Sequence, residues 1–152
     1  MRWGIFNAGP GYPRTVGLSH GITKALVPIP KGLHITVEEL LGEGQTVDGA
    51  WAQITCTKQG KPYRGDIVHI RTMLGNCGVA ELEGMYYLEE DYAKDFDTYL
   101  TEWIKWHGYS KMIAGVARPR LVERATEMGW AQFTEFVNRR SDNTCYLLEK
   151  NV

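Results

Sequence analysis

Few of the chemically capable side chains in this sequence stand at spacings that a catalytic or metal site requires. Cys77 and His69 would supply the nucleophile and the base of a covalent catalyst. No local signature accompanies them, and a turn cysteine beside a strand histidine with a structural role is the alternative. The cysteines and histidines form no Cys-x-x-Cys or His-x-x-x-His pair, so we expect no metal site.

Two clusters of opposite charge are the more prominent candidates. Three arginines stand together at the start of the last predicted helix, and an acidic run, Glu89–Asp97, opens the helix before it. Complementary clusters on one small domain favour self-association or docking on a protein partner, whereas a solvated edge with no binding role is the alternative. The interaction residues that this predicts are Arg118, Arg120, Arg124, Glu89, Glu90 and Asp91.

Composition limits the classes of function. The chain has 152 residues, 43% of them apolar and 23% charged, which is typical of one globular domain with its own core. The formal net charge of −1 gives no field that favours nucleic acid or an anionic membrane. We expect no membrane span and no signal peptide, because long apolar runs are missing. Three scattered cysteines indicate a reducing compartment such as the cytoplasm.

The first part of the chain differs from the rest in its high content of proline and glycine. Residues 1–32 hold four of the six prolines and are rich in glycine. Such residues block long regular elements, although Thr23–Val27 fits a strand. The sequence therefore predicts an N-terminal arm over 1–32 and a folded domain over 33–152. The arm is either a surface loop or a segment that docks on a partner.

Hydrophobic period and turn signals predict an α+β domain. Thr36-Val37-Glu38-Glu39 fits a capping box and predicts a short helix that ends at Gly42. Alternation with a period of two then predicts an antiparallel meander. The remaining predicted elements are strands over Ala50–Thr57, Asp66–Met73 and Val79–Tyr87, a helix from Glu89–Asp91 to about His107, a strand over Ser110–Ala117, a closing helix from Arg118-Pro119 to Gly129, and a hairpin of Gln132–Arg139 and Cys145–Glu149.

This order of elements resembles the GNAT (acetyltransferase-type) superfamily over residues 50–150. Met128-Gly129-Trp130 is similar to the Leu-Gly-Phe that ends the superfamily's closing helix, which implies a left-handed glycine cap and an aromatic ring under the sheet. With Trp103–Tyr109, the closing segment also resembles small GNAT-like proteins of tailed phages, some named acetyltransferases and some virion proteins. The resemblance implies a mixed sheet with an antiparallel meander, two main helices and a C-terminal hairpin.

The resemblance also implies where a donor would bind. GNAT enzymes hold the pyrophosphate of coenzyme A on a loop of pattern Arg/Gln-x-x-Gly-x-Gly/Ala, where glycines and free N–H groups at a helix start meet the anion. The corresponding segment, Leu88–Tyr92, has no glycine or arginine and three carboxylates. Each acid would repel a pyrophosphate by roughly 1 to 4 kcal/mol at about 4 Å. We therefore expect that the usual site is lost and that no cofactor binds, with acetyl-CoA as the cofactor of the alternative.

The superfamily's catalytic residues are only partly present. Its frequent general acid, a tyrosine four residues before the closing glycine, is Ala125 here, and Tyr109 or Tyr146 would have to replace it. Its base is often a glutamate on the long meander strand, where Glu81 and Glu83 share one face. A solvated strand face is the alternative for this pair.

These observations favour a non-catalytic GNAT-like scaffold that binds protein partners or itself. The resemblance implies a phage virion or accessory component, located in the cytoplasm or on the virion. The alternative function is an acyl-CoA-dependent N-acetyltransferase with an atypical cofactor loop and Glu81 or Glu83 as the base. Fold similarity does not decide between them.

Overall fold

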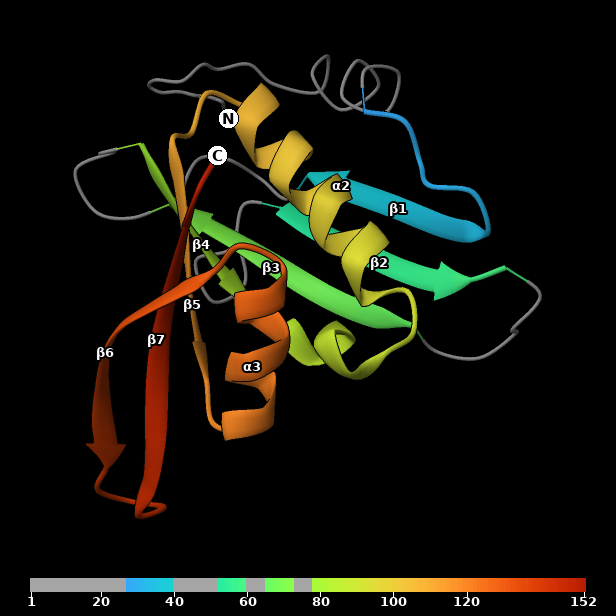
Figure 1. Ribbon diagram of the computed structural model, residues 1–152. Coiled ribbons are helices and arrows are strands. Elements are labelled where there is room, and N and C mark those ends of the chain that lie inside the picture. Colours follow the sequence, from blue (N-terminus) through green and yellow to red (C-terminus); the bar gives the residue numbers. More distant parts are fainter. Residues whose placement is uncertain (1–26, 40–51, 60–64, 73–77) are drawn as a thin grey trace.

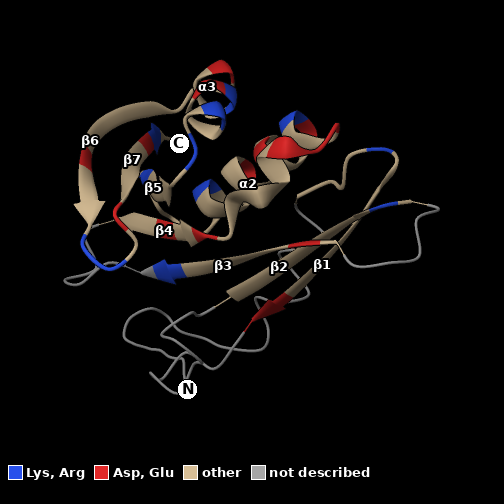
Figure 2. Ribbon diagram, turned by 90° about the horizontal axis from the view of Figure 1, so that it is seen from below, with Lys and Arg blue, Asp and Glu red and all other residues tan. Residues whose placement is uncertain are grey.

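In the part of the chain that the structure describes, seven strands form one sheet. The computed structural model describes residues 27–39, 52–59, 65–72 and 78–152. The elements are β1 (Leu33–Glu39), β2 (Ala52–Lys58), β3 (Asp66–Thr72), β4 (Val79–Glu83), the 3-10 helix η2 (Met85–Glu89), α2 (Ala93–Trp106), β5 (Lys111–Val116), α3 (Pro119–Glu127), β6 (Ala131–Asn138) and β7 (Asn143–Asn151). Helices α2 and α3 lie on the same side of the sheet (Figures 1 and 2).

The strands follow the order β1-β2-β3-β4-β5-β7-β6. Neighbouring strands are antiparallel except for β4 and β5, which run parallel with Ala80 beside Met112 and Leu82 beside Ala114. A parallel pair needs a crossover connection, and α2 provides it. The predicted α+β class, with a meander, two main helices and a C-terminal hairpin, is confirmed.

The predicted helix at Thr36–Glu39 is wrong, because these residues belong to strand β1. Leu33, Ile35 and Val37 are buried, and the residues between them are exposed. This period of two lets β1 pair with β2 along its whole length, with Val37 opposite Ile54. Sheet pairing and burial outweigh the local capping pattern, and the predicted end at Gly42 lies outside the described residues.

Strand β4 is also shorter than predicted. It ends at Glu83 because Gly84 has φ +96°, a left-handed conformation that turns the chain into η2. A Cβ at Gly84 would stand 2.4 Å from the backbone oxygen of Ile67, so no other residue fits there without movement. The turn buries Tyr87 and Leu88 and delays the start of α2 to Ala93, instead of the predicted Glu89–Asp91.

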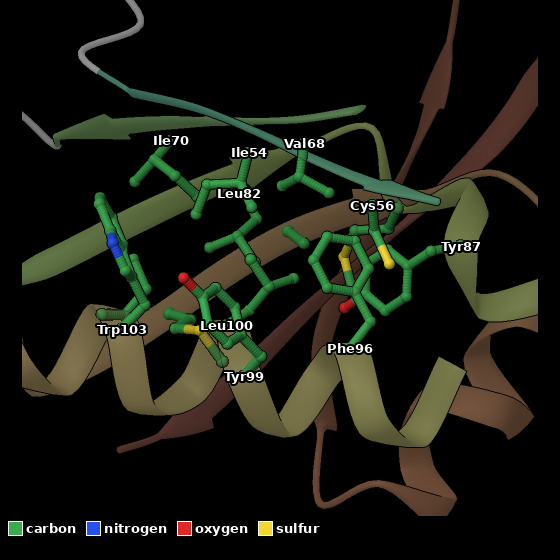
Figure 3. Packing of buried hydrophobic residues seen from close by; sticks show 14 of the residues in the cluster. Ile54, Cys56, Val68, Ile70, Leu82, Tyr87, Phe96, Tyr99, Leu100 and Trp103 are labelled. Atoms are coloured by element: carbon green, nitrogen blue, oxygen red, sulfur yellow. The ribbon is translucent and has the colours of Figure 1, made fainter. Parts of the chain in front are cut away.

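Helix α2 supplies the centre of the core, as its apolar stripe predicts. Phe96, Leu100 and Trp103 are fully buried against the sheet residues Ile54 and Leu82 (Figure 3). Burial of each such side chain contributes about 1.5–3 kcal/mol to stability. The helix therefore fixes the sheet face that it covers.

The closing helix α3 has the predicted ends. Pro119 occupies its first turn, and Gly129 adopts φ +96° directly after it. Trp130 then packs into the core with 2% of its surface exposed. The predicted left-handed glycine cap and buried aromatic ring are confirmed.

The division into an arm over 1–32 and a domain over 33–152 stays a prediction. Most of the arm, including nearly all of the predicted strand Thr23–Val27, lies outside the described residues. Within the described part, Val27 is buried in the core cluster, so this residue of the predicted arm packs with the domain.

Candidate active site

Two carboxylates of β4 lie on the sheet face opposite α2. Ala80 and Leu82 are buried beneath the helix, so Glu81 and Glu83 project from the other face. Glu83 is the last residue of the strand, immediately before the turn at Gly84. The predicted shared face of the two glutamates is thus seen in the structure.

Strand β3 places two basic side chains directly beside these carboxylates. Arg71 is paired in register with Glu81, and His69 with Glu83. The Arg71 Nη2 atom donates to the Glu83 Oε1 atom at 2.7 Å. Because three-quarters of the Arg71 side chain is buried, this ion pair holds the Glu83 carboxylate in one orientation at the strand end.

His69 is held in turn by β2. Its Nε2 atom lies 3.0 Å from the Oε1 atom of Gln53, its neighbour in register. An amide oxygen only accepts hydrogen bonds, so Nε2 is the donor in this contact. Gln53, His69 and Glu83 therefore form a row across three strands, next to Arg71 and Glu81.

The acidic segment before α2 contacts three arginines. One, Arg118, directly precedes α3, and the other two lie within it. Glu89 accepts hydrogen bonds from both Arg118 and Arg120. Arg124 donates to the backbone oxygens of Leu88 and Glu90. The two clusters predicted as separate interaction patches thus face each other within one chain.

The third acid of the segment is paired as well. The Lys58 Nζ atom of the β2 end lies 2.5 Å from the Asp91 Oδ2 atom. Basic side chains therefore accompany two of the three acids whose repulsion of a pyrophosphate the sequence predicts. The repulsion energy predicted from the sequence assumed that the acids had no basic partners. Its magnitude therefore does not apply to the folded chain.

Similar architectures occur among solved structures. The structure is similar to an IAA acetyltransferase from Bacillus cereus, with a TM-score of 0.58 and 10% identity over 79% of this chain and 99% of that one. It is similar to a probable acetyltransferase from Staphylococcus epidermidis, with a TM-score of 0.56 and 11% identity over 68% of each chain. An acetyltransferase of the GNAT family from Streptococcus pneumoniae gives a TM-score of 0.53 and 13% identity over 72% of this chain and 70% of that one.

This chain has the GNAT fold. No family model and no curated protein matches the sequence, so the likeness is one of structure. Identities of 10–13% support the fold alone. The resemblance to small phage proteins stays a prediction.

Within the GNAT fold, the hydroxyl expected on the closing helix is missing. Ala125 occupies the position and is fully buried. Of the two replacements, Tyr109 precedes β5 and so lies at the opposite end of that strand from the turn at Gly84, and burial raises its pKa. Tyr146 is paired with Val116 at the C-terminal end of β5, which is the end of the parallel pair where Glu83 stands. Because it shares a face with buried Val116, it lies on the helix side of the sheet, across from Glu83.

The remaining candidates from the sequence do not assemble into a second site. Cys77 lies outside the described residues, so its predicted pairing with His69 stays a prediction. Burial, with the nearby Asp66 carboxylate, raises the pKa of Cys56 to about 12, which keeps this thiol protonated at neutral pH. Among the described residues, no group of three or more His, Cys, Asp or Glu side chains is placed to hold a metal ion.

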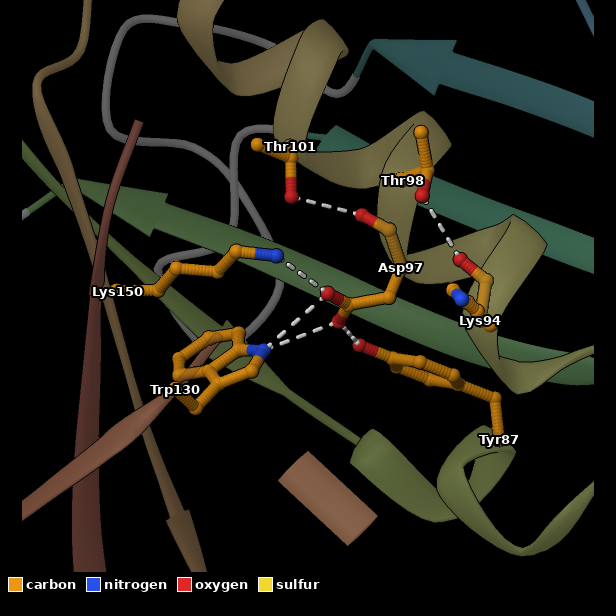
Figure 4. A network of polar contacts seen from close by, with 7 residues as sticks. All are labelled: Tyr87, Lys94, Asp97, Thr98, Thr101, Trp130 and Lys150. Atoms are coloured by element: carbon orange, nitrogen blue, oxygen red, sulfur yellow. Dashed lines mark hydrogen bonds and ion pairs between the residues drawn. The ribbon is translucent and has the colours of Figure 1, made fainter. Parts of the chain in front are cut away.

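Sequence reasoning did not find the buried carboxylate of α2, Asp97, which is 1% exposed. It accepts hydrogen bonds from Tyr87, Trp130 and Lys150, at 2.5, 3.1 and 2.8 Å for the shortest contact of each (Figure 4). Burial, followed by the charge of Asp97, raises the pKa of Tyr87 well above its usual value. The network joins η2, α2, the end of α3 and β7, and we assign it a structural role because all its polar groups point inward.

Sequence reasoning also missed Arg71 and Gln53 as partners of the candidate base. The period-two alternation on β2 and β3 would have placed them on the same face as Glu81 and Glu83, but the register that makes them neighbours is a long-range property.

Among the described helices, none combines the length and the apolar character that spanning a membrane requires.

Proposed function

We propose that the chain is an acyl-CoA-dependent N-acyltransferase in which a carboxylate of β4 accepts the proton of an amine. The observation that carries the proposal is the cluster of Glu81, Glu83, Arg71 and His69 at the C-terminal end of a strand in the parallel pair β4–β5. Ligands of open α/β sheets bind at such strand ends. The solved structures described above are all called acetyltransferases, which supports the same reaction class.

An amine acceptor needs a base and a negative surface. At neutral pH a primary amine is mostly an ammonium ion, which is not nucleophilic until it loses a proton. Glu81 and Glu83 attract the ammonium ion, and either carboxylate can take its proton. Arg71 orients Glu83, and Gln53 accepts a hydrogen bond from His69 beside it.

The residues that would hold the donor are basic side chains, not glycines. When bound, acyl-CoA supplies the acyl group as a thioester. The side chains of Arg118 and Arg120 are 61% and 70% exposed. Both can therefore bind a phosphate while they remain in contact with Glu89. At the start of α2, Tyr92 makes no side-chain capping hydrogen bond, so its side chain does not occupy the N–H groups of the first turn.

A non-catalytic GNAT-like scaffold is the competing proposal. It is favoured by buried Ala125 in place of a hydroxyl and by the glycine-free segment Leu88–Tyr92. Such a scaffold would bind partners through its charged surface and would not need the carboxylates of β4. The phage virion or accessory role belongs to this proposal.

Binding and turnover separate the two proposals. Thermal unfolding is measured with and without millimolar acetyl-CoA, since a ligand that binds only the folded state raises the melting temperature. Release of the coenzyme A thiol is then followed with a polyamine, free lysine and a peptide with a free amino terminus. The enzyme proposal predicts a raised melting temperature and thiol release that depends on one of these amines. An unchanged melting temperature together with no release from any amine would favour the scaffold.

A further inference from the structure

Among the residues that the structure describes, strand β6 forms an edge of the sheet and has a neighbour on one side only. It pairs with β7 only, and all eight of its residues are exposed. The tip of the β6–β7 hairpin extends past the N-terminal end of α3 (Figure 1). Phe133, Phe136 and Val137 each expose about half of their surface, which is unusual for three large apolar side chains on one strand.

The strand lacks most devices that keep an edge from pairing. A free edge presents unpaired N–H and C=O groups, and proteins protect it with proline, lysine or a bulge. The sequence of β6 has no proline or lysine. Its register is irregular between Gln132 and Thr134 and regular from Thr134 to Asn138. The regular half is therefore free to accept another strand.

The charges along this half are complementary to themselves. Glu135 is the one charged residue of β6, and Arg139 follows directly after the strand. The two lie two residues on either side of Val137. A two-fold axis at Val137 in an antiparallel pair therefore brings each Glu135 close to Arg139, the first turn residue after β6, of the second copy.

The same register also uses the exposed apolar side chains. Val137 stands opposite Val137 of the second copy, and Phe136 is diagonal to its own equivalent, within reach of an aromatic ring. A register centred on Glu135 would instead oppose two like charges.

We propose that β6 pairs with β6 of a second copy of this chain, antiparallel and centred on Val137, to form one continuous sheet across a two-fold dimer. The surface is separate from the carboxylates of β4, so the proposal does not depend on acyl transfer. The complementary charges and the exposed apolar side chains of β6 favour a second copy of this chain over an unrelated strand as the binding partner.

Charge reversal tests both the occupant and the register. The mass in solution is measured over a range of concentrations for the wild type, Glu135→Arg, Arg139→Glu and the double variant. Each single reversal opposes like charges across the pair and is expected to weaken the dimer by roughly tenfold. The double variant restores opposite charges and is expected to dimerise like the wild type.

Mixing the two single variants gives the sharpest outcome. One copy with Glu135→Arg and one with Arg139→Glu satisfy both contacts, so the mixture is expected to form heterodimers as stable as the wild-type dimer, whereas each variant alone dimerises more weakly. Arg140→Glu serves as the control, because Arg140 lies in the turn beyond the paired strand and takes no part in the Glu135–Arg139 contact, so its reversal should leave the dimer intact. Far-UV circular dichroism of each variant checks that this exposed hairpin still folds. A monomeric wild type at high concentration, or single variants as dimeric as the wild type, would overturn the proposal.

Discussion

The guanidinium of Arg71 on β3 lies 2.7 Å from the carboxylate of Glu83 on β4, and it reaches that residue diagonally, past the Glu81 that it faces in register. This contact fixes Glu83 before any substrate arrives, which is the kind of preorganisation that a catalytic base requires.

Replacing Arg71 should impair acyl transfer more than stability. Arg71→Ala leaves Glu83 without its partner, and we expect kcat for amine acylation to fall about tenfold or more because the base is no longer held in place. The free energy of unfolding should change by only about 1 kcal/mol, as for other partly exposed ion pairs. Steady-state kinetics and urea unfolding measure the two effects.

Lys111→Ala is the matched control for this experiment. Lys111 forms an ion pair of similar exposure with Glu149 on the same sheet face, but on β5 and β7. If both variants lose activity equally, Arg71 has no special role in orienting the base.

Releasing the arginines near α2 should strengthen donor binding. In Glu89→Gln, Arg118 and Arg120 lose their carboxylate partner and are free to bind phosphate, so we expect a lower Kd for acetyl-CoA. Arg118→Ala and Arg120→Ala should each raise Kd by about five- to twentyfold, as expected for loss of a charge-assisted hydrogen bond. Isothermal titration calorimetry at two salt concentrations measures these changes, with Arg140→Ala as the control. Identical affinity in all four proteins would place the donor elsewhere.

His107 is expected to cause part of the loss of folding stability at acidic pH. It donates from Nδ1 to the Trp103 backbone oxygen at 2.9 Å, and burial lowers its pKa from 6.5 to about 4. Between these pH values the histidine binds a proton in the unfolded chain but not in the folded chain. The free energy of unfolding therefore falls as the pH drops from about 6.5 to 4. The loss reaches up to about 3 kcal/mol for a shift of this size.

His107→Asn keeps a donor for the carbonyl and removes the titration. Its unfolding free energy, measured by urea denaturation from pH 7 to pH 4, should fall less steeply than that of the wild type. His34→Asn, which changes an exposed histidine of β1, is the control variant. Parallel pH profiles for wild type and His107→Asn would show that His107 titrates normally.

The Asp97 network predicts a large and specific loss of stability. Asp97→Asn removes the countercharge of Lys150, whose side chain is only 16% exposed. An uncompensated buried charge costs about 3–5 kcal/mol. Adding Lys150→Met should recover part of this loss, whereas Asp95→Asn on the exposed face of α2 should cost little. Urea denaturation measures all four proteins, and an unchanged Asp97→Asn would contradict the buried ion pair.

Local signals in the sequence predicted those elements whose residues act within one segment. The apolar stripe of α2, the run of β5 and the ends of α3 at Pro119 and Gly129 are such cases. Thr36–Glu39 was mispredicted because its capping pattern is local, while its pairing with β2 depends on residues far along the chain.

The same limit applies to the candidate site. Glu81 and Glu83 were predicted on one face because alternation along a single strand decides it. The contacts of Glu89 with Arg118, about thirty residues away, and of Arg71 with Glu83 across a turn, depend on how the sheet and α3 pack. Charge signs in sequence order could not show that the acidic and basic clusters pair with each other.

The carboxylates of β4 are the centre of the account, and their removal tests it most directly. Thiol release from acetyl-CoA is measured with the amine that gives turnover, for the wild type, Glu81→Gln, Glu83→Gln and the double variant, with Glu127→Gln on α3 as the control. General-base catalysis contributes about 10²–10⁴-fold, so the double variant should lose at least 100-fold in kcat while its melting temperature and its affinity for acetyl-CoA stay close to the wild type. A double variant that turns over the amine as fast as the wild type would contradict the assignment of these glutamates as the base.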